Sequence, residues 1–317
     1  MDGKNKAVLM GPFVGELYWE GGRFAPMLPH MIQSEYRKRK DILYIILTRK
    51  ERFDLYGKFA DILVPLKIPG DYKSLSPNCF RLNGLKPPQY KEIIDKFRKK
   101  YEKRYKIIKH IYPNVEKGKF LDKNQFPRSR MKFIYSPRND NYKLVNSYLP
   151  DNKPIVVLAP RFRKGFKRNW KHWQRFYDLL WRKKELLKDF TFVICGKEGE
   201  YKPDKYDRFY DMNKISLTEN SSLVGVLLVI LERAFFTFGS QSAIPNFSLL
   251  YGVDVLEFGC QKSLHTKTYN VKNTPITFID DRKYNSDPEE MIKRLEKLIR
   301  RKQEDARTTK KSMVNSK

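Results

Sequence analysis

Cysteine, histidine and long apolar runs are all scarce in this chain of 317 residues. The three cysteines, Cys79, Cys195 and Cys260, are odd in number and far apart, which argues against a disulfide framework. The histidines are isolated and lack the spacing of a zinc site. No stretch approaches the roughly 18 apolar residues that cross a membrane, and the N-terminus lacks the apolar region of a signal peptide. These absences predict a cytoplasmic protein.

Acidic side chains are also few relative to basic ones. The chain has 65 Lys and Arg against 36 Asp and Glu, a formal net charge of +29. The excess is concentrated in residues 91–144, 161–175 and 300–317, which hold 17, 7 and 7 basic side chains against 6, none and 2 acidic ones. Such an excess predicts anionic partners. The alternative is a lysine-rich chain whose helix faces are merely solvated.

Short apolar runs alternate with helical patterns along most of the chain. Strands are predicted at 6–11, 42–47, 62–65, 155–159, 190–195, 234–238, 254–258 and 275–279. In the second half, helices are predicted at 171–187, 221–232, 243–251 and 287–303, with Trp173 in the core. This alternation favours parallel sheets. The sequence therefore predicts an α/β protein of two Rossmann-like, doubly wound domains.

The two predicted domains divide near the segment Pro150–Pro154. Residues 1–150 form the N-terminal domain, which includes a basic helical insertion at about 88–148. Residues 151–303 form the second domain, and the polar, basic residues 304–317 are predicted to be a disordered tail.

A cluster of cations follows the strand predicted at 155–159. Five cations lie within residues 161–168, and they are Arg161, Arg163, Lys164, Lys167 and Arg168. A core cannot hold such a cluster, so it predicts a phosphate clamp. The alternative is a solvated loop in which the charges simply repel one another.

A polar turn lies between the strand at 234–238 and the helix that ends at Gly252. Ser240, Gln241 and Ser242 offer donors at the positive end of that helix, and Asn246 follows within its first turns. An ordinary helix cap would use the same residues. Because this turn and the basic loop both follow parallel strands, they should meet at the sheet edge where open α/β sheets bind ligands. Together they predict a diphosphate site.

These two segments resemble the donor domain of GT-B glycosyltransferases, and in particular the heptosyltransferase-like group. In that group a Lys/Arg-x-Trp segment follows the first strand of the second domain, as Arg168–Trp170 does here. A Ser/Gly-rich turn then opens a helix ending in Leu-Gly-Val, comparable to Leu250–Val253. Lys171 replaces the usual proline, and Ala243–Asn246 replaces the usual Gly-Pro-Met-His, so the donor stays open.

The resemblance covers residues 155–259 and implies a GT-B fold in which two domains face a central cleft. It implies that a nucleotide-sugar is the co-substrate and that neither a metal nor another cofactor is needed. The residues that would hold the donor phosphates are Lys167, Arg168, Ser240, Gln241 and Ser242.

The loop Gly11–Gly22 follows the first strand and carries two carboxylates. It lacks the Gly-x-Gly-x-x-Gly spacing and the Walker lysine of common nucleotide sites. By the resemblance, Gly15 and Glu16 occupy the position of a glycine and a catalytic base, and Glu20 lies one helical turn further on. Inverting transfer needs a carboxylate to take the proton of the acceptor hydroxyl. Glu16 and Glu20 are both candidate catalytic residues, and of the two we predict Glu16 as the base; alternatively, Glu16 caps a helix and Glu20 pairs with Arg23.

By the resemblance, the first domain carries the acceptor. In its basic insertion, residues 90–110 are predicted to form an amphipathic helix that interleaves cations with aromatic side chains, which suits a polyanion track with base stacking. The predicted acceptor contacts are Gly15, Tyr18, Trp19, Arg98, Lys99 and Arg104.

Two anionic acceptors fit these features. The first is a hydroxylated base in DNA, as in viral DNA-modifying glycosyltransferases, which would act in the host cytoplasm and would need the base flipped out of the duplex. The second is a phosphorylated lipid-linked or surface glycan at a membrane. We favour DNA, because the charge comes without an apolar amphipathic anchor. A non-catalytic nucleic-acid-binding protein on a relict transferase fold is the remaining alternative.

Overall fold

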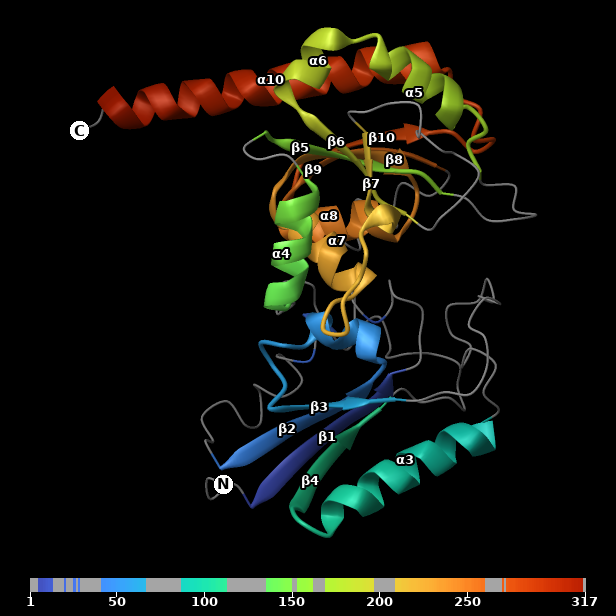
Figure 1. Ribbon diagram of the computed structural model, residues 1–317, viewed down its shortest axis with the longest axis vertical. Coiled ribbons are helices and arrows are strands. Elements are labelled where there is room, and N and C mark those ends of the chain that lie inside the picture. The colour runs from blue at the N-terminus through green and yellow to red at the C-terminus, as the bar shows by residue number, and fades with distance from the viewer. Residues whose placement is uncertain are drawn as a thin grey trace. The chain divides into compact units, whose positions relative to one another are not determined.

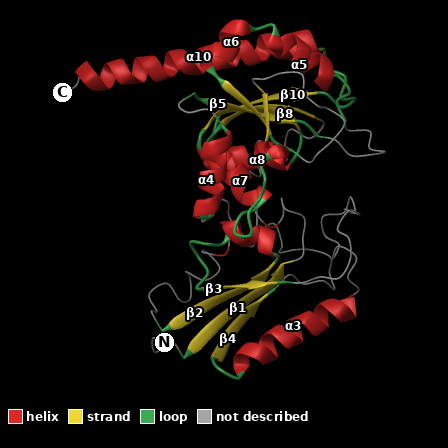
Figure 2. Cartoon of the chain, in the orientation of Figure 1, coloured by secondary structure: helices red, strands yellow, loops and turns green. Residues whose placement is uncertain are grey.

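The computed structural model describes residues 5–13, 20, 25–26, 28, 41–66, 87–112, 135–149, 153–161, 169–196, 209–259, 270 and 272–315. The chain divides into two compact units, each with its own parallel sheet (Figures 1 and 2). Unit 1 comprises Met1–Lys143 and Leu217–Val229, and unit 2 comprises Leu144–Ser216 and Ile230–Lys317. The division falls inside the helices α4 (Asn139–Tyr148) and α7 (Leu223–Glu232). No feature of the sequence had grouped residues 217–229 with the first half.

Unit 1 contains a four-stranded parallel sheet in the order β3-β2-β1-β4. Its strands are β1 (Lys6–Phe13), β2 (Ile42–Thr48), β3 (Ile62–Pro65) and β4 (Lys106–Ile111). Helix α3 (Pro87–Glu102) lies along this sheet (Figure 1) and contributes Phe97 and Tyr101 to a core shared with Leu9 of β1. A short 3-10 helix, η2 (Lys50–Leu55), follows β2. The first three predicted strands are confirmed.

Strand β4 corrects the predicted helix at 90–110. The helix ends at Glu102, and the following strand pairs in parallel with β1, from Lys6↔Lys106 to Met10↔Ile111. The sequence Lys-Ile-Ile-Lys-His-Ile continues the apolar spacing of the helix, so its periodicity does not distinguish the two structures. The predicted helical insertion is therefore wrong in this part, which belongs to the sheet.

Unit 2 contains a six-stranded parallel sheet in the order β10-β9-β8-β5-β6-β7. Its strands are β5 (Ile155–Ala159), β6 (Thr191–Ile194), β7 (Phe209–Asp211), β8 (Ala234–Ser240), β9 (Asp254–Gly259) and β10 (Ile276–Asp280). This order is that of the Rossmann fold, in which the strand order reverses between β5 and β8. The predicted α/β class is confirmed, although no apolar run had indicated β7.

Helices cover both faces of the second sheet (Figure 2). Helices α5 (Trp173–Trp181), α6 (Lys184–Asp189) and α10 (Pro288–Asn315) lie on one face, and α8 (Ala243–Tyr251) lies on the other. A turn of 3-10 helix, η4 (Met212–Lys214), follows β7. The core under α5 is aromatic, since Trp173 is fully buried and the rings of Phe176 and Phe238 stack 4.6 Å apart. The prediction that Trp173 belongs to the core is confirmed.

Two helix predictions need correction. The helix predicted at 171–187 is interrupted after Trp181, and α6 begins at Lys184. The last helix does not stop at residue 303 but continues to Asn315, so the predicted disorder is wrong for residues 304–315. That segment is polar, yet it includes Glu, Ala, Arg and Lys, which favour helix. None of the described helices combines the length and the apolar character needed to cross a membrane.

Candidate functional site

The polar segments that follow β5 and β8 meet at the carboxyl edge of the second sheet. The two strands pair in parallel up to Ala159↔Gly239. Just beyond that pair, Nη1 of Arg161 donates a hydrogen bond of 2.6 Å to the carbonyl oxygen of Gln241. The strand order reverses between these strands, and open α/β sheets bind ligands at this point. The two segments therefore meet where the sequence predicted.

Two glycines allow the backbones to pack closely at this edge. A Cβ on Gly239 would lie 2.6 Å from the Cβ of Ala159, and a Cβ on Gly259 would lie 2.6 Å from the Cβ of Gln241. Both distances are too short for carbon atoms. The backbone N–H of Gln241 also donates to the carbonyl oxygen of Phe258 at 2.9 Å. The turn after β8 is thus held between β5 and β9.

Helix α8 begins directly after this turn. Ser242 precedes it with an extended backbone (φ −153°, ψ −173°) and makes no side-chain capping bond. Further along the helix, Ser248 Oγ lies 2.8 Å from Thr237 Oγ1 of β8, which ties the buried face of α8 to the sheet. The N-terminus of α8 is therefore fixed at the sheet edge, with its first-turn N–H groups beside the turn.

Three buried polar atoms surround the start of α8. Ser240 Oγ, Ser242 Oγ and Asn246 Oδ1 have no hydrogen-bond partner among the residues that the structure describes. Asn246 does use its amide, because Nδ2 donates to the carbonyl oxygen of Ser242 at 2.7 Å. Two hydroxyl donors at the positive end of a helix fit the oxygens of an anion. The remaining amide oxygen fits a hydroxyl donor, such as that of a sugar.

The basic loop is described only at its two ends. Arg163, Lys167 and Arg168 lie outside the described residues, so their predicted phosphate contacts stay predictions. The loop begins at Arg161 and ends at Trp170, whose Nε1 donates to the carbonyl oxygen of Ser286 at 2.9 Å. Trp170 is fully buried in the aromatic core. The tryptophan of the Lys/Arg-x-Trp segment is therefore fixed at the C-terminal end of the loop.

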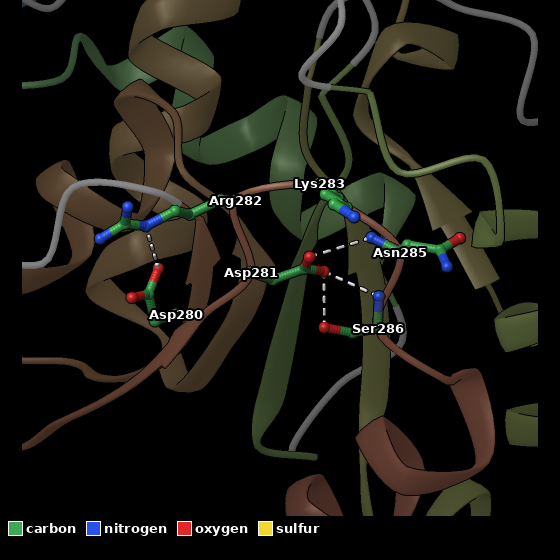
Figure 3. Close-up of a pocket in the computed structure, with 6 residues that line it drawn as sticks. All are labelled: Asp280, Asp281, Arg282, Lys283, Asn285 and Ser286. Atoms are coloured by element: carbon green, nitrogen blue, oxygen red, sulfur yellow. Dashed lines mark hydrogen bonds and ion pairs between the residues drawn. The ribbon is translucent and has the colours of Figure 1, made fainter.

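The turn after β10, which includes Ser286, lines a pocket of about 410 Å³ (Figure 3). Its lining residues are Asp280, Asp281, Arg282, Lys283, Asn285 and Ser286. Asp281 organises the turn by accepting hydrogen bonds from the Ser286 backbone N–H at 2.7 Å and the Ser286 hydroxyl at 2.6 Å. Partial burial opposes ionisation, but these hydrogen bonds prevail and lower the pKa of Asp281. This ionised turn positions Ser286, whose carbonyl oxygen accepts the hydrogen bond from Trp170.

In unit 1, the structure describes Glu20 but not Glu16. Glu20 is 3% exposed, and its Oε1 accepts hydrogen bonds from the Thr48 hydroxyl and, at 3.0 Å, from the Tyr56 hydroxyl. Burial raises the pKa of Glu20, although Arg52, Thr48, Arg49 and Tyr56 all act to lower it. Gly15, Glu16, Tyr18, Trp19 and Arg23 lie outside the described residues, so their predicted roles and the Glu20–Arg23 pair stay predictions.

The sequence did not predict which residues surround Glu20. Burial lowers the pKa of Arg52 to about 10, and Thr48, Tyr56 and Arg49 complete the group. A signal was present, because Thr48-Arg-Lys-Glu-Arg52 is a polar segment directly after a buried strand, as the basic loop after β5 is.

The strand order of the first sheet reverses between β1 and β4. Two aromatic side chains fix the end of β1 there. His110 Nε2 lies 2.9 Å from the carbonyl oxygen of Gly11, and the Tyr90 hydroxyl donates to the carbonyl oxygen of Pro12 at 3.0 Å. The sequence had indicated His110 only as an isolated histidine, because its proximity to Gly11 depends on the pairing of β4 with β1.

The basic face of α3 is exposed, but its aromatic side chains are not. Arg98 and Lys99 are exposed on the helix, and Arg104 is exposed just after it. Tyr90, Phe97 and Tyr101 are buried, with exposed fractions of 2%, 5% and 9%. The prediction that the aromatic residues of this helix stack on bases is therefore wrong for these three, and only its cations can meet a polyanion.

Comparison with solved structures places the fold. The chain is similar to ADP-heptose LPS heptosyltransferase II of E. coli, with 11% identity, a TM-score of 0.59, and 94% of this chain and 99% of that chain covered. It is similar to the E. coli heptosyltransferase WaaC with ADP, with 11% identity, a TM-score of 0.52, and coverage of 92% and 99%. It is also similar to a family 9 glycosyl transferase from Veillonella parvula, with 11% identity, a TM-score of 0.51, and coverage of 94% and 98%.

Two Rossmann-like units in this order, together with these similarities, show that the protein has the GT-B fold. The predicted heptosyltransferase-like fold is confirmed. At such low identity the likeness establishes the fold and not the activity. No family model matches the sequence, and no curated protein matches it either.

Proposed function

We propose that this protein is a glycosyltransferase that binds the diphosphate of a nucleotide-sugar at the N-terminus of α8. One observation carries the proposal: Ser240, Ser242 and Asn246 present buried polar atoms without partners among the described residues, beside Arg161 and at the reversal of strand order. Buried polar atoms in proteins are normally hydrogen-bonded. A diphosphate with its attached sugar supplies acceptors for the two hydroxyls and donors for the amide oxygen.

The same groups would promote departure of the diphosphate. As the acceptor oxygen attacks the anomeric carbon, the bond from that carbon to the diphosphate breaks and its electron pair leaves with the phosphate. Arg161 and the positive end of α8 would stabilise this charge, assisted by Arg163, Lys167 and Arg168 of the basic loop. We propose that these cations suffice without a metal ion. Glu16, in the loop after β1, would take the proton of the acceptor hydroxyl.

Nucleoside diphosphates should raise the melting temperature of the protein. A ligand that binds only the folded state at about 100 times its dissociation constant stabilises that state by roughly 2.7 kcal/mol. Thermal-shift measurements with ADP, UDP, GDP and CDP test this. The double variant Ser240→Ala/Ser242→Ala should lose most of the shift, whereas Ser147→Ala, an exposed serine of α4, should keep it. If no nucleotide shifts the wild type at millimolar concentration, the donor site is wrong.

We further propose that the acceptor is a hydroxylated base in DNA. The net charge of +29 and the exposed cations Arg98, Lys99 and Arg104 support a polyanionic acceptor. Two alternatives remain: a phosphorylated lipid-linked or surface glycan, and a relict transferase fold that binds nucleic acid without catalysis. Measurable sugar transfer would distinguish both transferase hypotheses from the non-catalytic relict. Binding to duplex DNA would distinguish a DNA acceptor from a glycan acceptor.

The triple variant Arg98→Gln/Lys99→Gln/Arg104→Gln should bind duplex DNA with a weaker salt dependence. For each phosphate that the variant no longer neutralises, the slope of log K against log salt should fall by roughly 0.9. Filter binding across a salt series measures this slope. Lys184→Gln/Lys188→Gln/Lys293→Gln removes the same charge from exposed positions of unit 2 and should change the slope less. Failure to bind duplex at low salt, with tight binding to anionic vesicles, would favour the glycan.

A further inference from the structure

An exposed aromatic ring lies at the reversal of strand order in the first sheet. Tyr112, directly after β4, is 44% exposed. Among the residues that the structure describes, the other exposed large apolar side chains are Leu217 and Leu223. The Tyr112 ring meets the ring of His110 edge to face, with centroids 4.9 Å apart and an angle of 72°. Tyr112 therefore presents an exposed aromatic ring at the carboxyl end of β4, beside the reversal of strand order at which sheets of this kind bind ligands.

The hydrogen bond of His110 fixes its tautomer. The carbonyl oxygen of Gly11 can only accept, so Nε2 of His110 carries the hydrogen across their 2.9 Å contact. Nδ1 of the neutral ring is then left with a lone pair, and no described residue hydrogen-bonds to it. Burial lowers the pKa of His110, so the ring is neutral near pH 7. Nδ1 is consequently able to accept a hydrogen bond from a ligand.

The ring of His110 is also held in place from a second side. Phe97 of α3 meets it at a centroid distance of 5.6 Å and an angle of 64°. Two aromatic edges and one hydrogen bond leave the imidazole little freedom to rotate. A side chain oriented in advance by its neighbours loses less entropy when it binds a ligand.

A cation on the neighbouring helix acts electrostatically on His110. The positive charge of Arg98 on α3 acts on His110 and helps to lower its pKa. Arg98 is exposed, and its contact with Glu102 is a long surface pair at 3.6 Å. Exposed pairs of this kind contribute little energy. Arg98 can therefore exchange this partner for a phosphate.

We propose that Tyr112, His110 and Arg98 form a nucleotide subsite, in which Tyr112 stacks on a base, His110 Nδ1 accepts a hydrogen bond from that base, and Arg98 contacts its phosphate. These are the contacts by which proteins hold unpaired nucleotides. The inference rests on the proposed DNA acceptor and extends it to a particular place in unit 1. A base flipped out of a duplex presents both its flat face and its hydrogen-bonding edge.

Tyr112→Ala should weaken the preference for a strand that carries bases. The probes are a short oligothymidylate and an abasic strand of equal length, compared by fluorescence anisotropy. Loss of one base stack weakens binding roughly 5- to 150-fold, so the affinity ratio of the two probes should fall by at least the lower factor. Tyr112→Phe keeps the ring and should keep the ratio. Because Tyr112 is exposed, Tyr112→Ala should fold, as circular dichroism will show.

The affinity ratio of the oligothymidylate and the abasic strand should depend on pH, because His110 titrates. Below its pKa, which lies under the usual value of about 6.5, Nδ1 carries a hydrogen and can no longer accept one from thymine N3–H. The charged groups that act on His110 are Arg98 and Asp95 of α3, while β1 contributes the Gly11 carbonyl. Protonation also gives His110 a positive charge, which strengthens binding to either strand. Because this effect is common to both probes, it cancels in their affinity ratio. His110→Gln keeps an amide acceptor that does not titrate and should give a ratio independent of pH.

Two outcomes overturn the inference: an equal ratio for the wild type and Tyr112→Ala, or wild-type protein that binds neither strand. Failure of the donor site would appear elsewhere, as the absence of any thermal shift with nucleoside diphosphates. The two failures are therefore distinguishable.

Discussion

Glu16→Gln is expected to slow sugar transfer by roughly 10²- to 10⁴-fold, the usual contribution of a positioned general base. The amide has nearly the same shape as the carboxylate but cannot take a proton from the acceptor hydroxyl. Nucleotide binding should be unchanged, because the proposed diphosphate site is built from unit 2 residues around α8. The measurements are kcat with the nucleotide-sugar whose diphosphate gives the largest thermal shift, and the size of that shift in the variant.

Glu20→Gln is the matched control. Its carboxylate is buried against Thr48 and Tyr56, so we expect transfer to change only a few-fold. The variant should instead alter how stability depends on pH. Since burial raises the pKa of Glu20, the wild-type fold gains stability as the pH falls toward the ordinary value near 4.5 and loses it as the pH rises through the raised pKa. Because a glutamine side chain does not titrate, Glu20→Gln should lack this pH-dependent contribution to stability.

The outcomes of this pair separate the mechanisms. Loss of transfer in Glu20→Gln alone would assign the base to Glu20. Full activity in both variants would contradict a carboxylate base. Wild-type protein that binds a nucleoside diphosphate but transfers no sugar to any acceptor would support the relict alternative.

Asp54→Ala is expected to destabilise unit 1 by about 2–6 kcal/mol, because two buried donors would each lose a partner at a cost of about 1–3 kcal/mol. Asp54 is fully buried in η2. Its carboxylate accepts hydrogen bonds from Arg138 Nη2 at 2.9 Å, from Asn141 Nδ2 at 2.9 Å and from the Ser222 hydroxyl at 2.7 Å. The variant would leave these donors unpaired in two separate segments of unit 1, at residues 138–141 and at Ser222. Hydrogen exchange of peptides from β1 and β2, measured by mass spectrometry, reports the destabilisation.

Asp140→Asn provides the control for this variant. Asp140 lies in the first turn of α4, and its hydrogen bond with the Thr218 hydroxyl, at 3.3 Å, is exposed. A surface substitution of this kind changes stability by about 0.5 kcal/mol or less. If the amide hydrogens of β1 and β2 exchange no faster in Asp54→Ala than in Asp140→Asn, the Asp54 carboxylate does not stabilise the contacts of η2 with Asn141 and Ser222.

Local patterns predicted most strands of both sheets. The parallel strands are nearly continuous apolar runs because both of their faces are buried, as in Ile155–Ala159, where all five residues are buried. The polar residues directly after such runs stand out for the same reason, so the sequence alone indicated Arg161 and Ser240. Spacing did not reveal β4, because that strand follows a helix with no change in the apolar pattern.

Composition and local spacing were enough to establish the α/β class, the strand–helix order, and the placement of cations and hydroxyls after β5 and β8. These features depend on residues close together in the chain. The folded chain was needed to show that His110 lies against Gly11, that Glu20 is buried against Thr48 and Tyr56, and that Asp54 accepts hydrogen bonds from two distant segments. Each of these depends on contacts between residues far apart in sequence, which no local period encodes.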